Sequence, residues 1–476
     1  MIKNEDLLML DGIGQAELIR RKEISSTEVV ELSISRISEI NPIINAVVQE
    51  MYEHARELSL NPEEGTIFSG VPFLIKDFLA EYAGFRFNAG SKFLEGYISE
   101  EDTELVRRYK RSGLVTLGKT NSPEFAIGCT TEPLLNGPTR NPWDINLTTG
   151  GSSGGAAAAV SSGLVPLAHG NDAGGSIRIP ASCCGVFGLK PTRGRNPLGP
   201  GLGDAIGGLV AEHALTRSVR DSAALLDSTA GPSFGDPYFT ALPERPFLQE
   251  IGVDPGQLRI GFSSDMPRGG KAHPDCVEAV ERVAYLCQDL GHDVEEVSPK
   301  FNANVMFEAF SKMMASGVAW MIRDWERKIN KKAVENLFEP NIWGLLQAGS
   351  KITSPEYLLA VQDIQNGSRE VAEFFNKYDF WLTPTLGKPP VPLGTFIYEG
   401  DPFDLRRRLA EFVPFTWISN LTGQPGMSVP LHWNGDGLPI GVHFTGKFGD
   451  EATMFRIASQ LEVALPWANR IPIMRE

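Results

Sequence analysis

Gly150-Gly151-Ser152-Ser153-Gly154-Gly155 and Asp172-Ala173-Gly174-Gly175-Ser176-Ile177-Arg178 are two glycine–serine clusters that follow each other closely in the chain. Upstream of both, an apolar run ends in a charged pair, Gly70-Val71-Pro72-Phe73-Leu74-Ile75-Lys76-Asp77. Because burial disfavours an ammonium group, the lysine at the end of this run is expected to lose its proton easily. Serines on glycine-rich turns place hydroxyl and exposed backbone N–H groups near it. The pattern therefore indicates a serine nucleophile, a proton relay and an oxyanion hole.

The first cluster has other interpretations when it is taken alone. Gly150-x-Ser152-x-Gly154 matches the nucleophile elbow of α/β-hydrolases, but it follows the polar segment 141–149 and not an apolar strand. A phosphate-binding loop would need Gly-Lys-Ser/Thr after the glycines, and this is missing. A flexible turn before a helix would also explain one such cluster. Two clusters together with Lys76 favour catalysis over that turn.

Composition and charge narrow the class of protein. The chain has 476 residues and a formal net charge of −15, which argues against nucleic acid or an anionic membrane as a partner. Its five cysteines show no C-x-x-C spacing, so neither a disulfide framework nor a metal site is expected. The N-terminal residues lack the apolar core of a signal peptide, and no run of 18 apolar residues occurs. We therefore expect a reduced, cytoplasmic setting.

The remaining pattern predicts an α/β fold in a single domain over residues 1–476. Short apolar strands alternate with helices, which favours a sheet with crossover connections. The strands are expected at 70–76, 114–117, 164–168, 258–262, 380–383, 427–430 and 437–442. The small residues 154–161 are expected to form a helix that packs close to its neighbour. Ser25 and Glu28 form a capping box for a helix that Pro42 is expected to end. Residues 302–365 are helical and rich in aromatic side chains, and they are predicted to be an inserted substrate lobe.

Several of these motifs together resemble the amidase signature family. The resemblance is carried by residues 70–77, 150–155, 172–180, 185–192 and the late strand 437–442. It covers nearly the whole chain and places the signature core at 60–200. His443 stands where many members carry a glutamine. Residues 169–173 and 461–467 look closest to the branch of 6-aminohexanoate cyclic-dimer hydrolases, with aryl-acylamidases and urethane-cleaving amidases as similar relatives.

The resemblance implies an α/β/α sandwich with a central mixed sheet, and a serine amidohydrolase that needs no cofactor or metal. It implies Ser176 as nucleophile, Ser152 as the bridging serine after a cis Gly151–Ser152 peptide, and Lys76 as base. The oxyanion hole would be formed by the backbone N–H groups of Ala173, Gly174, Gly175 and Ser176. Ser153, Asp172 and Arg178 would support this turn. His169, the nearest histidine, is expected to be structural.

Substrate choice is predicted from two apolar segments. Ile127, Cys129 and Thr130 resemble the family's pocket-lining loop. Candidates for the opposite wall are Met313, Met314, Ser316 and Trp320 in the helical lobe. An apolar pocket favours aryl, cyclic or linear aliphatic amides, and carbamates, over glutamine. The expected partner is a small-molecule amide, with no nucleic acid or membrane and with a homodimer left open. One alternative is the A subunit of a tRNA-dependent amidotransferase. The other is a non-catalytic binding protein, but the intact Lys76, Ser152 and Ser176 argue against a loss of activity.

Overall fold

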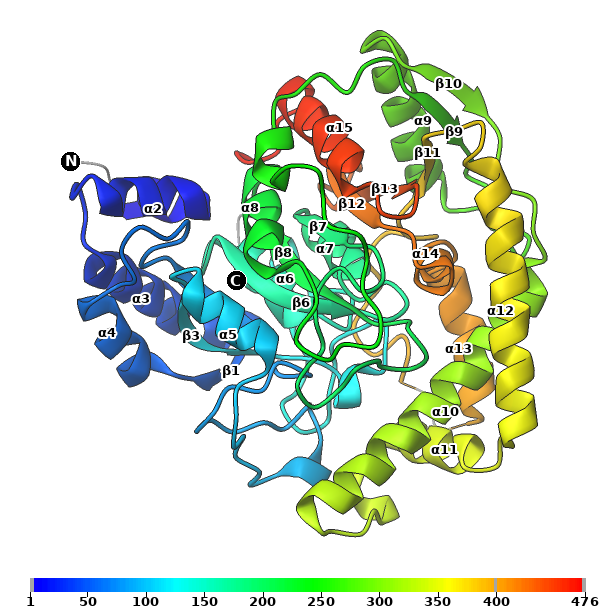
Figure 1. The fold of residues 1–476 in the computed structure, drawn as a ribbon, viewed down its shortest axis with the longest axis horizontal. Helices are drawn as coiled ribbons and strands as arrows, with labels where there is room; N and C mark the ends of the chain where they lie inside the picture. The colour runs from blue at the N-terminus through cyan, green and yellow to red at the C-terminus, as the bar shows by residue number, and fades with distance from the viewer. Residues whose placement is uncertain (1–3, 398–399, 473–476) are drawn as a thin grey trace.

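The computed structural model describes residues 4–397 and 400–472. In this part of the chain eleven strands form one mixed sheet in the order β1-β3-β2-β6-β8-β7-β12-β13-β11-β9-β10 (Figure 1). Their bounds are β1 Val47–Glu50, β2 Pro72–Lys76, β3 Val115–Thr120, β6 Leu167–Asp172, β7 Phe187–Lys190, β8 Ala211–Thr216, β9 Arg259–Phe262, β10 Asp293–Glu296, β11 Phe380–Pro384, β12 Gly426–Trp433 and β13 Pro439–Gly446. β4 (Arg140–Asn141) and β5 (Asp144–Thr148) pair separately. The predicted mixed α/β sheet is confirmed.

Helices cover both faces of the sheet because successive strand residues point to opposite sides. On β2, Leu74 joins the core formed with α3 (Ser26–Ile44), α6 (Gly154–Ser161) and α7 (Arg178–Cys184). Phe73 and Ile75 join the opposite core. That opposite core includes side chains of α2 (Gly12–Arg20), α5 (Glu104–Arg111) and α8 (Val219–Thr229). Farther along the sheet, a second core includes side chains of α9 (Pro274–Asp289) and α15 (Glu451–Ala464).

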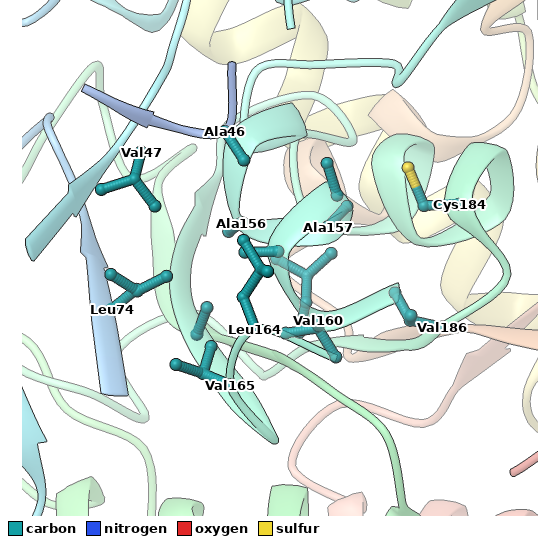
Figure 2. Packing of buried hydrophobic residues seen from close by; sticks show 14 of the residues in the cluster. Ala46, Val47, Leu74, Ala156, Ala157, Val160, Leu164, Val165, Cys184 and Val186 are labelled. Atoms are coloured by element: carbon teal, nitrogen blue, oxygen red, sulfur yellow. The ribbon is translucent and has the colours of Figure 1, made fainter. Parts of the chain in front are cut away.

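The helix α6 lies unusually close to the sheet because its side chains are small. Ala156, Ala157 and Val160 pack against Leu74 and neighbouring apolar residues (Figure 2). A Cβ atom on Gly155 would lie 2.5 Å from the backbone nitrogen of Asn121, so only glycine fits there. The bounds expected for this helix agree with the structure. Close packing of α6 fixes the position of Ser152 and Ser153, which directly precede it.

The stretch expected to form a helical lobe consists of α10 (Ala303–Ile329), α11 (Pro340–Gly349) and α12 (Ser354–Phe374). These helices pack on one another, and α10 and α12 lie on the opposite side of the molecule from α2, α3 and α4 (Tyr52–Leu60) (Figure 1). α13 (Pro402–Phe412) and α14 (Thr416–Thr422) add to the same region. In this described part of the chain no helix is long and apolar enough to cross a membrane.

Several element boundaries differ from the sequence prediction, and hydrogen bonds explain two of these differences. α3 begins with the predicted capping box but continues through Pro42 to Ile44, because Asn45 in a left-handed conformation donates its N–H to the Asn41 carbonyl and closes the last turn. β6 begins at Leu167 and not at Leu164, since the Leu164 N–H is bonded to the last turn of α6. β6 also extends beyond the predicted end at residue 168 to Asp172, which begins the second glycine–serine cluster.

Candidate active site

Lys76 ends the buried strand β2, and its side chain is completely buried. Its Nζ lies 2.7 Å from Ser152 Oγ, 3.0 Å from Ser153 Oγ and 2.6 Å from Asn171 Oδ1. The Asn171 amide nitrogen donates to the Phe78 carbonyl, so its oxygen is turned toward the lysine. The amine therefore meets three oxygen atoms and no carboxylate at hydrogen-bond distance among the described residues.

Burial has a direct effect on the protonation of Lys76. Removal from water is the largest cause and lowers the pKa of Lys76 to about 7, while the more distant Glu212 and Asp172 carboxylates oppose the shift. A neutral amine has two N–H donors and one lone pair. Ser153 Oγ and Asn171 Oδ1 are placed to accept the two N–H bonds, which leaves the lone pair for the hydroxyl of Ser152.

The two glycine–serine turns are joined by a backbone bond. The Gly151–Ser152 peptide is cis, and the N–H of Ser153 donates to the carbonyl oxygen of Ser176 at 3.1 Å. Ser152 and Ser176 line the same cavity. Lys76 and Ser152 are fully buried, whereas Ser176 is partly open to the cavity. The hydroxyl of Ser176 is therefore the more accessible of the two to a substrate.

The turn from Ala173 to Ser176 presents its N–H groups unequally. Gly175 is buried and donates its N–H to Asp172 Oδ1 at 2.7 Å, so this donor is already occupied. The N–H groups of Ala173, Gly174 and Ser176 have no acceptor within residues 4–397 and 400–472, and all three residues are partly open at the cavity wall. Of the four donors expected for an oxyanion hole, the geometry leaves three available.

Asp172 and Arg178 form a buried pair that shapes this turn. The guanidinium donates to both carboxylate oxygens at 2.9 Å, and the side chains of both residues are fully buried. Burial alone would raise the pKa of Asp172, but the charge and hydrogen bonds of Arg178 hold it well below its ordinary value. Asp172 also accepts the N–H of Ile177. The pair therefore clamps both ends of the short turn around Ser176, in the supporting position expected for these residues.

His443 completes the shell around Arg178. Burial, followed by the nearby guanidinium charge, lowers the pKa of His443 well below its ordinary value, so the imidazole is neutral. Arg178 Nη1 lies 3.0 Å from His443 Nε2. Because a guanidinium can only donate, Nε2 accepts and the ring proton is assigned to Nδ1. The histidine offers the acceptor that a glutamine side-chain oxygen would otherwise provide.

His169 lies behind Lys76 and not beside the serines. Its Nδ1 accepts the backbone N–H of Lys76 at 3.2 Å, and its Nε2 faces a Glu212 carboxylate oxygen. With Nδ1 accepting from the backbone, the ring proton belongs on Nε2, where it donates to Glu212. Both nitrogen atoms are engaged, so His169 supports the end of β2 and is not free to act as a base.

A cavity of about 300 Å³ opens onto Ser152, Ser176 and the free N–H groups. Ile127, Cys129 and Thr130 line it, in the place expected for the pocket loop. The opposite wall holds aromatic residues that the sequence had not assigned to the pocket, among them Phe307, Phe310 and Trp417, together with the charged Arg406. A Cβ atom on Gly174 would lie 3.0 Å from the Phe310 ring, so this wall directly adjoins the turn from Ala173 to Ser176.

Four residues of α10 were expected in that opposite wall: Met314 lines the cavity, whereas Met313, Ser316 and Trp320 do not. α10 turns Phe307, Phe310 and Met314 toward the cavity. Ser316 and Trp320 follow Met314 by about 200° and 240° around the helix, so they face elsewhere. Trp320 is 41% exposed and lines a separate cavity of about 140 Å³. Helical periodicity from Phe307 could have identified the correct face.

Within residues 4–397 and 400–472 no group of three or more His, Cys, Asp or Glu side chains is placed to hold a metal ion. All five cysteines are free and buried. Burial raises the pKa of the Cys129 thiol, which lines the cavity, and this keeps it protonated. The reactive groups of the site are thus hydroxyls, an amine and backbone N–H groups.

The sequence profile of the amidase family matches residues 28–455. The chain belongs to the amidase signature family. A 6-aminohexanoate-cyclic-dimer hydrolase of Paenarthrobacter ureafaciens is 37% identical to it over 98% of this chain and 97% of that protein. The structure of a 6-aminohexanoate cyclic dimer hydrolase with its substrate matches with a TM-score of 0.94 at 36% identity, covering 98% of this chain and 99% of the other.

A bacterial aryl acylamidase of the amidase signature family also matches, with a TM-score of 0.87 and 27% identity over 97% of each chain. These relatives confirm the predicted family, its branch and the predicted fold class. The chain is an amidohydrolase enzyme.

Proposed function

We propose that this amidase hydrolyses carboxylic amides through an acyl-enzyme on Ser176, with Ser152 relaying the proton to Lys76. The observation that carries the proposal is the environment of the Lys76 amine. It is buried, its pKa is lowered to about 7, and its lone pair faces Ser152 Oγ at 2.7 Å. A base of this pKa is half neutral near pH 7, which suits proton transfer at physiological pH.

In the acylation step, Ser176 Oγ attacks the amide carbonyl carbon. Its proton passes to Ser152 Oγ while the Ser152 proton passes to Lys76 Nζ, so the hydroxyl donates and accepts at once. The free N–H groups of Ala173, Gly174 and Ser176 stabilise the negative oxygen of the tetrahedral intermediate. The lysine proton then returns through Ser152 to the leaving nitrogen, and the C–N bond breaks. A water molecule, deprotonated by the same relay, releases the acid.

The cavity wall supports an apolar substrate. Ile127, Ile179, Phe310 and Trp417 line it beside Ser176. Burial of apolar surface contributes roughly 25 cal/mol per Å², so such a wall favours aryl and aliphatic amides over small polar ones. We propose cyclic and linear aliphatic amides, aryl amides and carbamates as the substrate range, in a cytoplasmic enzyme that acts without a partner subunit.

The nucleophile is tested by labelling with a fluorophosphonate and locating the modified peptide by mass spectrometry. Ser176 is expected to carry the label, and Ser176→Ala is expected to abolish turnover of p-nitroacetanilide with an unchanged melting temperature. Ser228→Ala on α8, whose hydroxyl is bonded only to its own helix, is the matched control. A label on Ser152 would refute the assignment. Glutaminase activity without anilide hydrolysis would favour the amidotransferase subunit instead.

A further inference from the structure

Arg406 lies on α13 and lines the cavity that holds Ser176. Its guanidinium carbon is 5.2 Å from the centre of the Phe310 ring, and its Nε is buried without a hydrogen-bond partner. Among residues 4–397 and 400–472 no carboxylate acts on its charge, and burial alone shifts its pKa. A cation at the wall of a substrate cavity is thus left without a protein counter-charge.

Arg178, the fully buried arginine of the site, differs in this respect. Arg178 is saturated by Asp172, Asn420 and the carbonyl of Thr416. On the same helix as Arg406, the exposed Arg407 pairs with Asp404 at the surface. The unpaired state is therefore particular to the residue that faces the cavity, and it is not a general property of α13.

Two carboxylates also line the cavity, but neither compensates this charge. Glu132 accepts the N–H of Gly394, and Glu339 accepts the N–H of Leu134, each at 2.7 Å. Burial is the sole cause that shifts the pKa of Arg406, lowering it to about 10, and no nearby carboxylate opposes the shift. At neutral pH the guanidinium stays protonated. A partly buried cation without a counter-charge carries a desolvation cost, and an anion bound in the cavity would offset that cost.

The position of Arg406 relative to the reacting atoms is set by Phe310. The tip of this ring lies 3.0 Å from the position that a Cβ atom on Gly174 would take, in the turn from Ala173 to Ser176. The Arg406 guanidinium lies over the same ring. A substrate whose amide reaches Ser176 therefore extends past a single aromatic side chain to meet Arg406. The ring also keeps the space between the two groups apolar, which suits a hydrocarbon spacer.

We propose that Arg406 binds a carboxylate of the substrate, held by an apolar spacer some bonds away from the scissile amide. The planar fork of a guanidinium matches both oxygen atoms of a carboxylate. The substrate class is then amides of acidic character: acyl groups that end in a carboxylate, or amines that carry one, such as the linear amides of ω-amino acids. This inference rests on the proposed function and adds a specificity-determining residue to it.

The test compares matched acid and primary-amide substrates, in which only the charge differs. Glutaryl p-nitroanilide is paired with its glutaramoyl analogue, and 4-acetamidobenzoate is paired with 4-acetamidobenzamide. The first pair places the carboxylate on the acyl part and the second on the leaving amine. For the wild type, kcat/KM is expected to favour the acid by about tenfold to hundredfold in one of the pairs, as for a hydrogen bond to a charged group.

Arg406→Gln is expected to remove this preference, and Arg407→Gln, the same change one residue along on the exposed face, is expected to retain it. Thermal melting shows whether each variant is folded. As a readout that does not need turnover, calorimetry on Ser176→Ala is expected to show tighter binding of the same acid than of its amide, and weaker acid binding when Arg406→Gln is added.

These measurements test the proposed function and the role of Arg406 separately. Hydrolysis of the neutral members by wild type, but not by Ser176→Ala, supports the proposed function whatever the acid preference. Absence of any acid preference in both pairs, or a preference that survives in Arg406→Gln, overturns the role of Arg406 alone. If no amide is cleaved, the calorimetric comparison of acid and amide still supports or overturns the anion site.

Discussion

Asp172 Oδ1 accepts the backbone N–H of Gly175 at 2.7 Å, and this bond decides which donors of the turn can serve an oxyanion. The occupied N–H points inward, so the N–H groups on either side, at Gly174 and Ser176, are left at the cavity wall. A fully buried carboxylate thus sets the geometry of the backbone donors that the proposed mechanism uses. Its own position depends on Arg178, which holds both of its oxygen atoms.

Asp172→Asn is expected to unfold the protein at lower denaturant concentration and to reduce kcat. The change leaves the fully buried Arg178 without its counter-charge, and breaking a buried pair in this way costs about 3–5 kcal/mol. Urea titration followed by tryptophan fluorescence measures the loss. Asp404→Asn, which disrupts an exposed pair with Arg407, is the control and is expected to shift the midpoint little. Equal midpoints for the two variants would contradict the supporting role of Asp172.

The rate of amide hydrolysis is expected to depend on a group with a pKa of about 7, because Lys76 must be neutral to accept a proton. Since the neutral form is populated above that pKa, kcat/KM should rise with pH through about 7 and then level off. Lys76→Ala is expected to lower the rate by about 10² to 10⁴-fold. A pH–rate profile from pH 5 to about 10 measures the acid limb, the range in which kcat/KM rises with pH. A wild-type rate in Lys76→Ala would refute the base assignment.

Glu212 offers a way to shift that limb without touching the serines. Its carboxylate raises the pKa of Lys76, so Glu212→Gln is expected to lower the pKa further and move the acid limb to lower pH. The measurement is the same pH–rate profile, read as the pH of half-maximal kcat/KM. Glu281→Gln on the exposed face of α9 removes the same charge and should leave the limb in place. A limb that moves to higher pH in Glu212→Gln would show that the titrating group is not Lys76.

Gly175→Ala is expected to destabilise the protein and reduce hydrolysis. Gly175 has a φ of +134°, which L side chains rarely adopt, and a Cβ atom there would lie 2.3 Å from Thr416 Oγ1. Strained backbone of this kind costs of the order of 1–3 kcal/mol, and the turn would have to move away from Thr416. Calorimetric melting and kcat measure the two effects. Gly435→Ala, where a Cβ atom meets nothing within 4 Å, is the matched control. Unchanged kcat in Gly175→Ala would argue against a fixed turn.

Ile127→Phe is expected to lower kcat/KM for bulky aryl or cyclic amides more than for small aliphatic amides, because Ile127 lines the cavity. One added group in an apolar pocket changes selectivity by about tenfold to hundredfold. Trp320→Ala is expected to leave the same ratio unchanged, since Trp320 lines the other cavity. A panel of anilides of increasing acyl size measures both. Uniform losses across the panel in Ile127→Phe would indicate damage to the fold and not a contact with substrate.

Much of the central architecture follows from local sequence. The apolar run before Lys76 forms β2, and the small residues 154–161 form α6 with the predicted bounds. These patterns suffice because each element is defined by its own periodicity and by its neighbouring turns. The ends of elements follow less directly from the local sequence. Near Pro42 and Leu164, hydrogen bonds in the last turn decide where the helix ends.

The sequence by itself determined the residues to which the proposed chemistry is assigned: Lys76 after an apolar strand, serines on glycine turns, and an Asp172–Arg178 pair six residues apart. The tertiary structure alone decided which donors of the turn remain free, and which face of α10 meets the cavity. Phe310 faces it and Trp320 does not. Arg406 reaches the same cavity from a helix 230 residues beyond Ser176 in the sequence. Such placements depend on the rotation and packing of distant helices, which no local pattern encodes.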